Sequence, residues 1–130
     1  MFFVKTYIDN SKQIKGLGLF AEENIKSNKI IYKQNKSLDL FIKNKELLKL
    51  DKIERDFIKH YGYKDKIKNI WHLSFDNIRF CNHSKTINNI SQKTVKNQTL
   101  IISIKDIKKG EELFQDYSEF ENLRKELRSI

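Results

Sequence analysis

Apolar residues along this chain gather in short runs, and polar segments separate one run from the next. The runs at 2–8, 29–33, 70–75, 78–81 and 99–104 have the length of β-strands and are rich in Ile, Phe and Val. They predict a mainly β protein with short strands.

A helical pattern interrupts the strands in the middle of the chain. Five apolar residues recur there at steps of three and four: Leu47, Leu50, Ile53, Phe57 and Tyr61. This spacing predicts a helical insert over about 44–61 with one stripe facing a core, and Gly62 follows as a stop.

The end of the chain carries a second helical pattern. Its apolar positions are Phe120, Leu123, Leu127 and Ile130. Ser118 and Glu121, three residues apart, form a capping box that satisfies the amides of a first helical turn. A C-terminal helix is therefore predicted over about 118–130.

Segments 24–31 and 106–113 echo each other as a polar turn that leads into an apolar strand. Gly110 falls opposite Asn28, and Asn is the residue that best replaces Gly where φ is positive. Two similar turns are predicted, although the echo is too short to prove duplication.

Length and composition restrict the kind of protein that this chain can be. The 130 residues, with no proline and four glycines, show no linker, so we expect one domain over 1–130 with its core at about 4–117. A single cysteine, Cys81, excludes an internal disulfide and a zinc site of paired cysteines. Lys5 interrupts the first apolar run too early for a signal core, and no run would span a membrane. The expectation is a soluble cytoplasmic or nuclear protein.

The net charge of +9 raises the possibility of a nucleic-acid partner. However, the lysines are scattered through every segment among many Asn and Ile residues, a pattern that codon composition also produces. A nucleic-acid surface is therefore possible but not favoured.

Three polar clusters are candidates for chemistry. The first is Gly16-Leu17-Gly18, whose glycines permit a close backbone approach or simply a tight turn. The second is Arg79-Phe80-Cys81-Asn82-His83-Ser84, which a capped turn with a structural histidine would also explain. The third runs from Gly110 to Tyr117 and could be an exposed hairpin arm.

Taken in order, these clusters resemble the signature of the SET family, and the resemblance extends from about Val4 to Tyr117, with a brevity similar to short viral and bacterial members. It implies a β-clip fold of small sheets in which the last segment crosses under a loop in a knot-like way. It also implies methyl transfer from S-adenosylmethionine, with no metal, to the side-chain amine of a protein or peptide lysine, a histone-like substrate being one candidate.

The resemblance assigns roles by position. Gly16, Leu17 and Gly18 would contact the methyl donor through their backbone. Arg79, Asn82 and His83 would line its amino-acid and adenine ends, with Phe120 as a further neighbour. Tyr117 matches the tyrosine at the methyl-transfer centre, where its hydroxyl could orient the lone pair of the lysine amine.

The chain departs from the family at several points. Ile87-Asn88 stands where the family commonly has Pro-Asn, which makes the turn less rigid, and the cysteine-rich zinc segment of chromatin-modifying members is absent. Gln115 occupies a usually aromatic position, two before the tyrosine, that influences how many methyl groups fit.

Acidic residues concentrate around the candidate catalytic tyrosine: Glu111, Glu112, Asp116, Glu119 and Glu121. They suggest an acidic lip that attracts a basic peptide, with Glu112, Gln115 and Asp116 as substrate-binding residues. The alternative is that they suit a hairpin and a helix start, where carboxylates favour the macrodipole.

Two other functions stay open at this stage. A SET-fold module that has lost catalysis could hold a peptide or nucleic acid, although it would not need Asn82, His83 and Tyr117 together. A basic nucleic-acid protein with accidental motif matches would show a strongly salt-dependent affinity for DNA or RNA.

Overall fold

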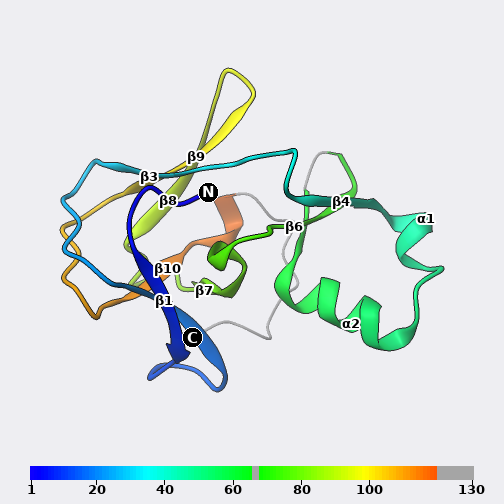
Figure 1. Cartoon of the computed structure of the whole chain (residues 1–130), viewed down its shortest axis with the longest axis horizontal. Coiled ribbons are helices and arrows are strands. Elements are labelled where there is room, and N and C mark those ends of the chain that lie inside the picture. Colours follow the sequence, from blue (N-terminus) through cyan, green and yellow to red (C-terminus); the bar gives the residue numbers. More distant parts are fainter. Residues whose placement is uncertain (66–67, 120–130) are drawn as a thin grey trace.

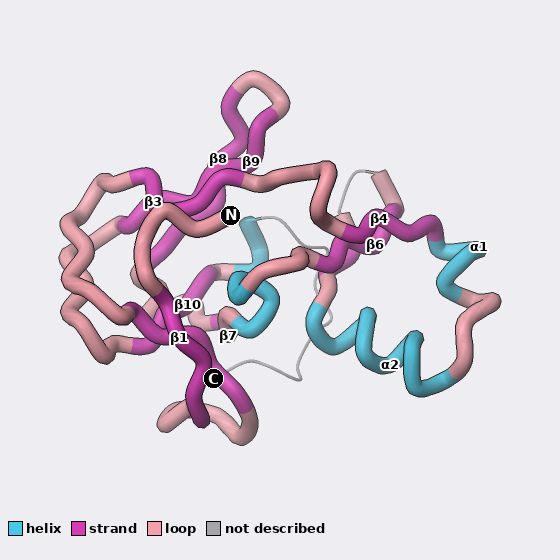
Figure 2. Tube along the Cα trace, viewed as in Figure 1, coloured by secondary structure: helices cyan, strands magenta, loops and turns pink. Residues whose placement is uncertain are grey.

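The computed structural model describes residues 1–65 and 68–119, which form a mainly β fold of three small sheets (Figures 1 and 2). One sheet has the order β1-β2-β10-β7, from Thr6–Asn10, Leu17–Ala21, Glu112–Gln115 and Asn82–His83. Another has the order β3-β9-β8, from Ile30–Lys33, Gln98–Ser103 and Ile90–Val95. The last has the order β4-β6-β5, from Leu40–Lys43, Ile70–Leu73 and Tyr63–Lys64.

The core is made of apolar residues from the first two sheets and the turns beside them. It comprises Val4, Leu19, Ala21, Ile25, Ile31, Tyr32, Cys81, Ile90, Ile101, Ile107 and Leu113. Leu19, Ile31, Ile90 and Leu113 are fully buried, and burying such a side chain stabilises the fold by about 1.5 to 3 kcal/mol. The apolar runs thus form strands because each side chain has a sheet to pack against.

The two echoing turns pair with each other. Ile25 and Ile107 each donate a backbone N–H to the other's carbonyl at 2.8 Å, and both side chains are buried. Asn28 and Gly110 have φ values of 60° and 91°, so the prediction of a left-handed residue in each turn is confirmed. The echo is therefore a packing pair that lies along one edge of the molecule (Figure 1).

The helical insert is present, but the prediction of one continuous helix is wrong. The structure has α1 at Asn44–Leu47 and α2 at Lys52–Tyr61, and the Glu54 side chain accepts the N–H of Asp51 at 3.0 Å to start α2. This break changes the buried face. Ile53 is 85% exposed, whereas Ile58, outside the predicted stripe, is buried.

The prediction of a strand over 78–81 is also wrong. Asn77–Phe80 form a 3-10 helix, η1, whose first turn is capped by Asp76. Oδ1 of Asp76 accepts the N–H of Ile78 at 3.2 Å, a local hydrogen bond that competes with strand pairing.

Tyr117–Glu119 form a 3-10 turn, η2, at the end of the described chain. Asp116 caps this turn, because its Oδ1 accepts both the N–H of Ser118 at 3.0 Å and the Ser118 hydroxyl at 2.7 Å. The predicted capping box of Ser118 and Glu121 stays a prediction, because Glu121 lies outside the described residues. Glu121, Phe120 and the rest of the predicted helix lie outside the described residues.

Strand β10 enters the first sheet between β2, to which it is antiparallel, and β7, to which it is parallel. This placement accords with the expected crossing of the last segment, while the threading itself stays a prediction. Among residues 1–65 and 68–119, no helix is long and apolar enough to cross a membrane.

Gly62 directly follows α2, at a position where there is no room for a side chain. A Cβ at this position would lie 2.6 Å from the Ile58 carbonyl oxygen and 2.8 Å from that of His72. Gly62→Ala should therefore destabilise the protein by about 1 to 3 kcal/mol. Gly110→Asn, which copies Asn28 in an open turn, should change stability by no more than about 0.5 kcal/mol. Urea unfolding measures both, and equal stability of the two variants would contradict this account.

Candidate active site

The three polar clusters of the sequence lie on three neighbouring strands, β2, β10 and β7. Phe20 pairs with Glu112, and Gln115 pairs with His83, so β10 contacts the other two clusters. The structure thus brings together residues that lie 92 and 32 positions apart in the chain.

The first cluster supplies a turn and a close approach. Gly16 has a φ of 115°, which a side chain would strain. A Cβ on Gly18 would lie 2.6 Å from Oε2 of Glu112, so a side chain there would displace the Glu112 carboxylate. The carbonyl oxygen of Leu17 accepts a hydrogen bond from Nδ2 of Asn82 at 2.9 Å. The backbone of this cluster is therefore part of the site.

Asn82 is fully buried at the centre of these contacts. Its Nδ2 also donates to Oε2 of Glu112 at 3.1 Å. Its Oδ1 is buried without a partner among the described residues. A buried acceptor without a donor costs about 1 to 3 kcal/mol, which a ligand that supplies a donor would offset.

His83 holds the backbone of Tyr117. Its Nδ1 accepts the Tyr117 N–H at 2.9 Å, and the two rings lie 5.0 Å apart between centroids. Burial lowers the pKa of His83 from its ordinary value of 6.5; Asp116 opposes this shift and Lys85 reinforces it. The ring is thus neutral at pH 7, with the proton on Nε2.

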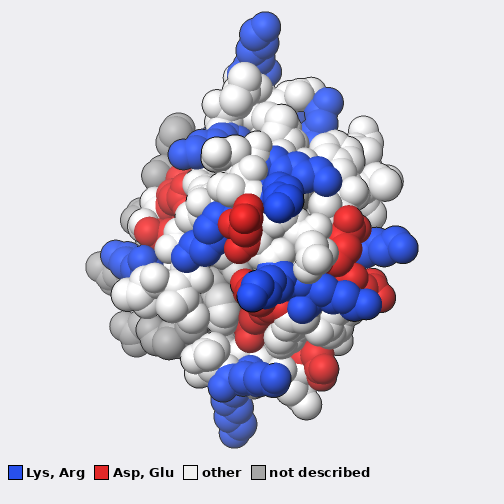
Figure 3. Space-filling view, turned by 90° about the vertical axis from the view of Figure 1, so that its left-hand side faces the viewer, with Lys and Arg blue, Asp and Glu red and all other residues white. Residues whose placement is uncertain are grey.

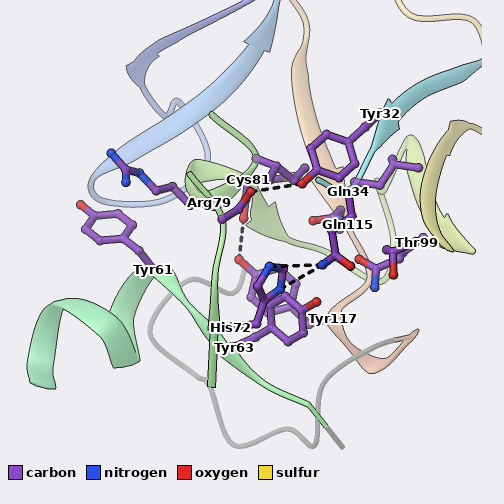
Figure 4. Close-up of a pocket in the computed structure, with 14 residues that line it drawn as sticks. Tyr32, Gln34, Tyr61, Tyr63, His72, Arg79, Cys81, Thr99, Gln115 and Tyr117 are labelled. Carbon is purple, nitrogen blue, oxygen red and sulfur yellow. Dashed lines mark hydrogen bonds between the residues drawn. The ribbon is translucent and has the colours of Figure 1, made fainter. Parts of the chain in front are cut away.

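The side chain of Tyr117 reaches a narrow cavity of about 40 Å³ (Figure 4). Its hydroxyl donates to the Cys81 carbonyl at 2.5 Å, so the oxygen is fixed in position. Gln115 is also buried in this wall, and its Nε2 has no partner among the described residues.

Sequence reasoning missed several residues of this cavity. Three further tyrosines and a histidine line it: Tyr32, Tyr61, Tyr63 and His72. Tyr61 had been assigned to the packed stripe of the helix, and no local motif marks the other three. These residues come from β3, α2, β5 and β6, so only the tertiary structure collects them around Tyr117.

Arg79 also lines the cavity, on the side of the insert. Its guanidinium lies 5.0 Å from the ring centroid of Phe80 and 5.9 Å from that of Phe57. These distances fit cation–π contacts with both rings. Arg79 thus joins η1 to α2.

Among the described residues, the acids of the predicted lip are not part of the wall of this cavity. No carboxylate of the described chain lines it. Glu112 instead accepts the hydroxyl of Ser11 at 2.8 Å and the Asn82 amide. Asp116 caps η2. Burial raises the pKa of its carboxyl, but the hydrogen bonds from Ser118, together with the nearby His83 and Lys85, lower that pKa overall. Glu119 accepts the Ser91 hydroxyl at 2.5 Å. Glu121 lies outside the described residues.

A model of the SET domain matches residues 16–118 of this chain. The chain belongs to the SET family. A search of the curated proteins gave no match, so the more specific comparisons are with solved structures.

Those structures include a candidate histone methyltransferase and a Polycomb complex. This SET domain is 28% identical to a Plasmodium falciparum candidate histone methyltransferase, covering 88% of this chain and 93% of that one with a TM-score of 0.61. It is 27% identical to Chaetomium thermophilum Polycomb Repressive Complex 2 bound to S-adenosylmethionine, with 95% of this chain covered and a TM-score of 0.66. The apo form of that complex gives a TM-score of 0.69 at 27% identity over 92% of this chain. The SET domain spans only 16% of the chain in either Polycomb structure.

The turn after His83 departs from the family's Pro-Asn but is not loose. Oγ of Ser84 accepts the N–H groups of Thr86 and Ile87 at 3.2 and 3.0 Å. Asn89 then donates to the Glu112 carbonyl and accepts the Phe114 N–H, each at 2.9 Å. Side-chain hydrogen bonds therefore fix the turn, and the asparagine that makes them is Asn89, one residue beyond Asn88.

The residues around Asn82 fit S-adenosylmethionine. The donor carries an ammonium group and a sulfonium, both cationic, and the Asn82 Oδ1 and the Glu112 carboxylate are acceptors. Because Gly18 has no side chain, the Glu112 carboxylate can lie beside the backbone of the first cluster. The chemistry of this donor set therefore matches the cofactor that a Polycomb relative binds.

The pKa shift of His83 predicts a pH dependence of stability. Because the folded pKa is lower than 6.5, the unfolded chain binds more protons as the pH falls below that value. The free energy of unfolding should therefore decrease as the pH falls from 6.5, since protonated Nδ1 cannot accept the Tyr117 N–H. His83→Asn keeps an acceptor in place of Nδ1 but does not titrate. Denaturant unfolding from pH 7.5 to 5 should show a shallower dependence in this variant, and identical slopes would disprove the assignment.

Proposed function

We propose that this SET domain transfers a methyl group from S-adenosylmethionine to the side-chain amine of a protein lysine. The observation that carries the proposal is the arrangement of the β2-β10-β7 sheet. Asn82, whose Oδ1 has no partner among the described residues, directly precedes His83 on β7, and His83 accepts the backbone N–H of Tyr117. Membership of the SET family and the S-adenosylmethionine-bound relative support it.

The methyl donor would bind beside Asn82. When bound, S-adenosylmethionine supplies a methyl group already activated by its sulfonium. The backbone of Leu17 and Gly18 lines this place, and Glu112 adds a negative charge beside it. His83, with its proton on Nε2, has a donor left for the cofactor or for solvent. Phe120, assigned here by position, lies outside the described residues.

The lysine would enter the cavity of Tyr117. A narrow, largely aromatic cavity disfavours the charged ammonium, which in water has a pKa of about 10.4. The Tyr117 hydroxyl donates to the Cys81 carbonyl, so its oxygen presents lone pairs that can orient the amine. Gln115, with an unused amide N–H, can contact the same group. These residues align and desolvate the substrate.

The structure gives little support to the idea that acidic residues select a basic peptide by its charge. Arg79 is the charged side chain that lines the cavity within the described chain, and Glu112, Asp116 and Glu119 are engaged elsewhere. We therefore propose selection by shape and by lysine itself, with a protein or peptide as partner.

The alternative of nucleic-acid binding is not favoured by the face drawn in Figure 3, where Lys and Arg are interspersed with Asp and Glu. The paired turns illustrate this mixture. Their exposed lysines include Lys26, Lys105 and Lys108, and Asp106 and Glu111 are exposed beside them. No single-sign field of the kind that binds phosphates covers this face.

Asn82→Ala should lower the affinity for S-adenosylmethionine about ten- to a hundredfold, because it removes a hydrogen bond to a charged group. Isothermal titration calorimetry measures this, and Asn44→Ala in α1 serves as the control with unchanged affinity. A wild-type protein that binds no cofactor at millimolar concentration would refute the enzymatic proposal.

Tyr117→Phe should reduce kcat by about a hundredfold or more while cofactor affinity changes little, since only the hydroxyl is removed. Loss of the hydrogen bond to the Cys81 carbonyl should lower the free energy of unfolding by about 1 to 3 kcal/mol. Tyr7→Phe, a change on β1 where the ring stacks on Phe20, is the matched control. Methyl transfer to a peptide, followed by mass spectrometry, provides the readout. Full turnover of Tyr117→Phe would assign the role to another tyrosine of the cavity, such as Tyr61 or Tyr63.

A further inference from the structure

His72, which lines the Tyr117 cavity, forms a buried histidine–carboxylate pair with Asp39. Nε2 of His72, on β6, is 2.7 Å from Oδ2 of Asp39, and the two side chains are 6% and 0% exposed. Oδ1 of Asp39 accepts the N–H of Phe75 at 3.1 Å. Because both carboxylate oxygens are engaged, Asp39 is held in one position and fixes the imidazole that it faces.

The ring of His72 is held from both sides. It stacks on Phe41 at 4.7 Å with an interplanar angle of 7°, and Tyr63 meets it edge-on at 4.8 Å. Since Nε2–H donates to Asp39, the neutral ring carries its lone pair on Nδ1. The amide nitrogen of Gln34 lies 3.2 Å from Nε2 and 3.5 Å from Nδ1, so Nδ1 has only a long contact within the described chain.

The proposed reaction requires a proton acceptor in this cavity. A lysine that enters as an ammonium must lose a proton before its nitrogen can accept a methyl group. The other titratable side chains of the wall are Tyr32, Tyr61, Tyr63, Arg79, Cys81 and Tyr117. Burial raises the pKa of Tyr32 well above its ordinary value, and guanidinium stays protonated. Imidazole is the side chain in this wall whose ordinary pKa lies near neutrality.

We propose that His72, oriented by Asp39, accepts the proton that the substrate lysine loses, an inference that rests on the proposed methyl transfer. An N–H bond of the ammonium breaks, its electron pair stays on the amine nitrogen, and a new N–H bond forms at Nδ1 of His72. That electron pair then forms the N–C bond, while the electrons of the S–C bond remain on sulfur. Asp39 stabilises the imidazolium until its proton passes to solvent.

His72→Gln tests the proposal, because the amide can still donate to Asp39 but cannot take up a proton. At pH 7 we expect kcat to fall about a hundredfold with unchanged affinity for S-adenosylmethionine. The difference from wild type should narrow as the pH approaches about 10, since the lysine then loses its proton unaided. The pH profile of kcat on a peptide provides the readout.

His60→Gln is the matched control, because this half-buried histidine of α2 is not among the residues that line the cavity. Its kcat profile should match wild type. The His83 titration occurs in wild type and variant alike and so cancels in their ratio. An unchanged kcat in His72→Gln, or a loss of the same size at every pH, would show that the pair is structural and overturn the proposal.

A second variant covers the case in which His72→Gln does not fold, as judged by circular dichroism. Asp39→Asn keeps the shape but removes the charge that stabilises the imidazolium, so its loss of kcat should also narrow as the pH rises. A pH-independent loss, or failure of both variants to fold, counts against the proposal. The proposed function fails separately, if the wild-type protein neither binds the cofactor nor transfers methyl groups.

Discussion

The site depends on one structural feature, the insertion of β10 between β2 and β7. This strand is only four residues long, yet it contacts the glycine cluster on one side and the Asn82-His83 pair on the other. Because β7 has two residues, backbone pairing alone is too short to fix it. The tight register therefore needs support from side chains.

That support comes from polar side chains that bond to backbone groups. Asn89 bridges the Glu112 carbonyl and the Phe114 N–H, His83 receives the Tyr117 N–H, and Tyr117 returns a hydrogen bond to Cys81. All of these residues except the partly buried Glu112 are buried. In such surroundings an unmade hydrogen bond costs about 1 to 3 kcal/mol, so the network favours one arrangement.

The hydrogen bonds of the buried polar atoms also indicate where ligands would bind. The Asn82 Oδ1 and Gln115 Nε2 atoms are buried without partners in the described chain, while the carboxylates of Glu112 and Asp116 are already engaged. The two atoms without partners therefore belong to the residues proposed to bind the methyl donor and the lysine. The two carboxylates stabilise the fold through their hydrogen bonds. His72, hydrogen-bonded to the buried Asp39, lines the same cavity as Gln115.

The sequence by itself determined the β class, the echoing turns, the insert and the residues of all three clusters, because periodicity, glycine positions and motif order are local properties. It misassigned 78–81 and the buried face of 44–61, since Asp76 and the break before Lys52 act through hydrogen bonds that periodicity does not register. Only the tertiary structure showed that Glu112, predicted to bind substrate, accepts a hydrogen bond from Asn82. Only the tertiary structure showed that Tyr32 and His72 line the same cavity as Tyr117. Those contacts join residues distant in the chain, and their geometry depends on packing between sheets rather than on any local pattern.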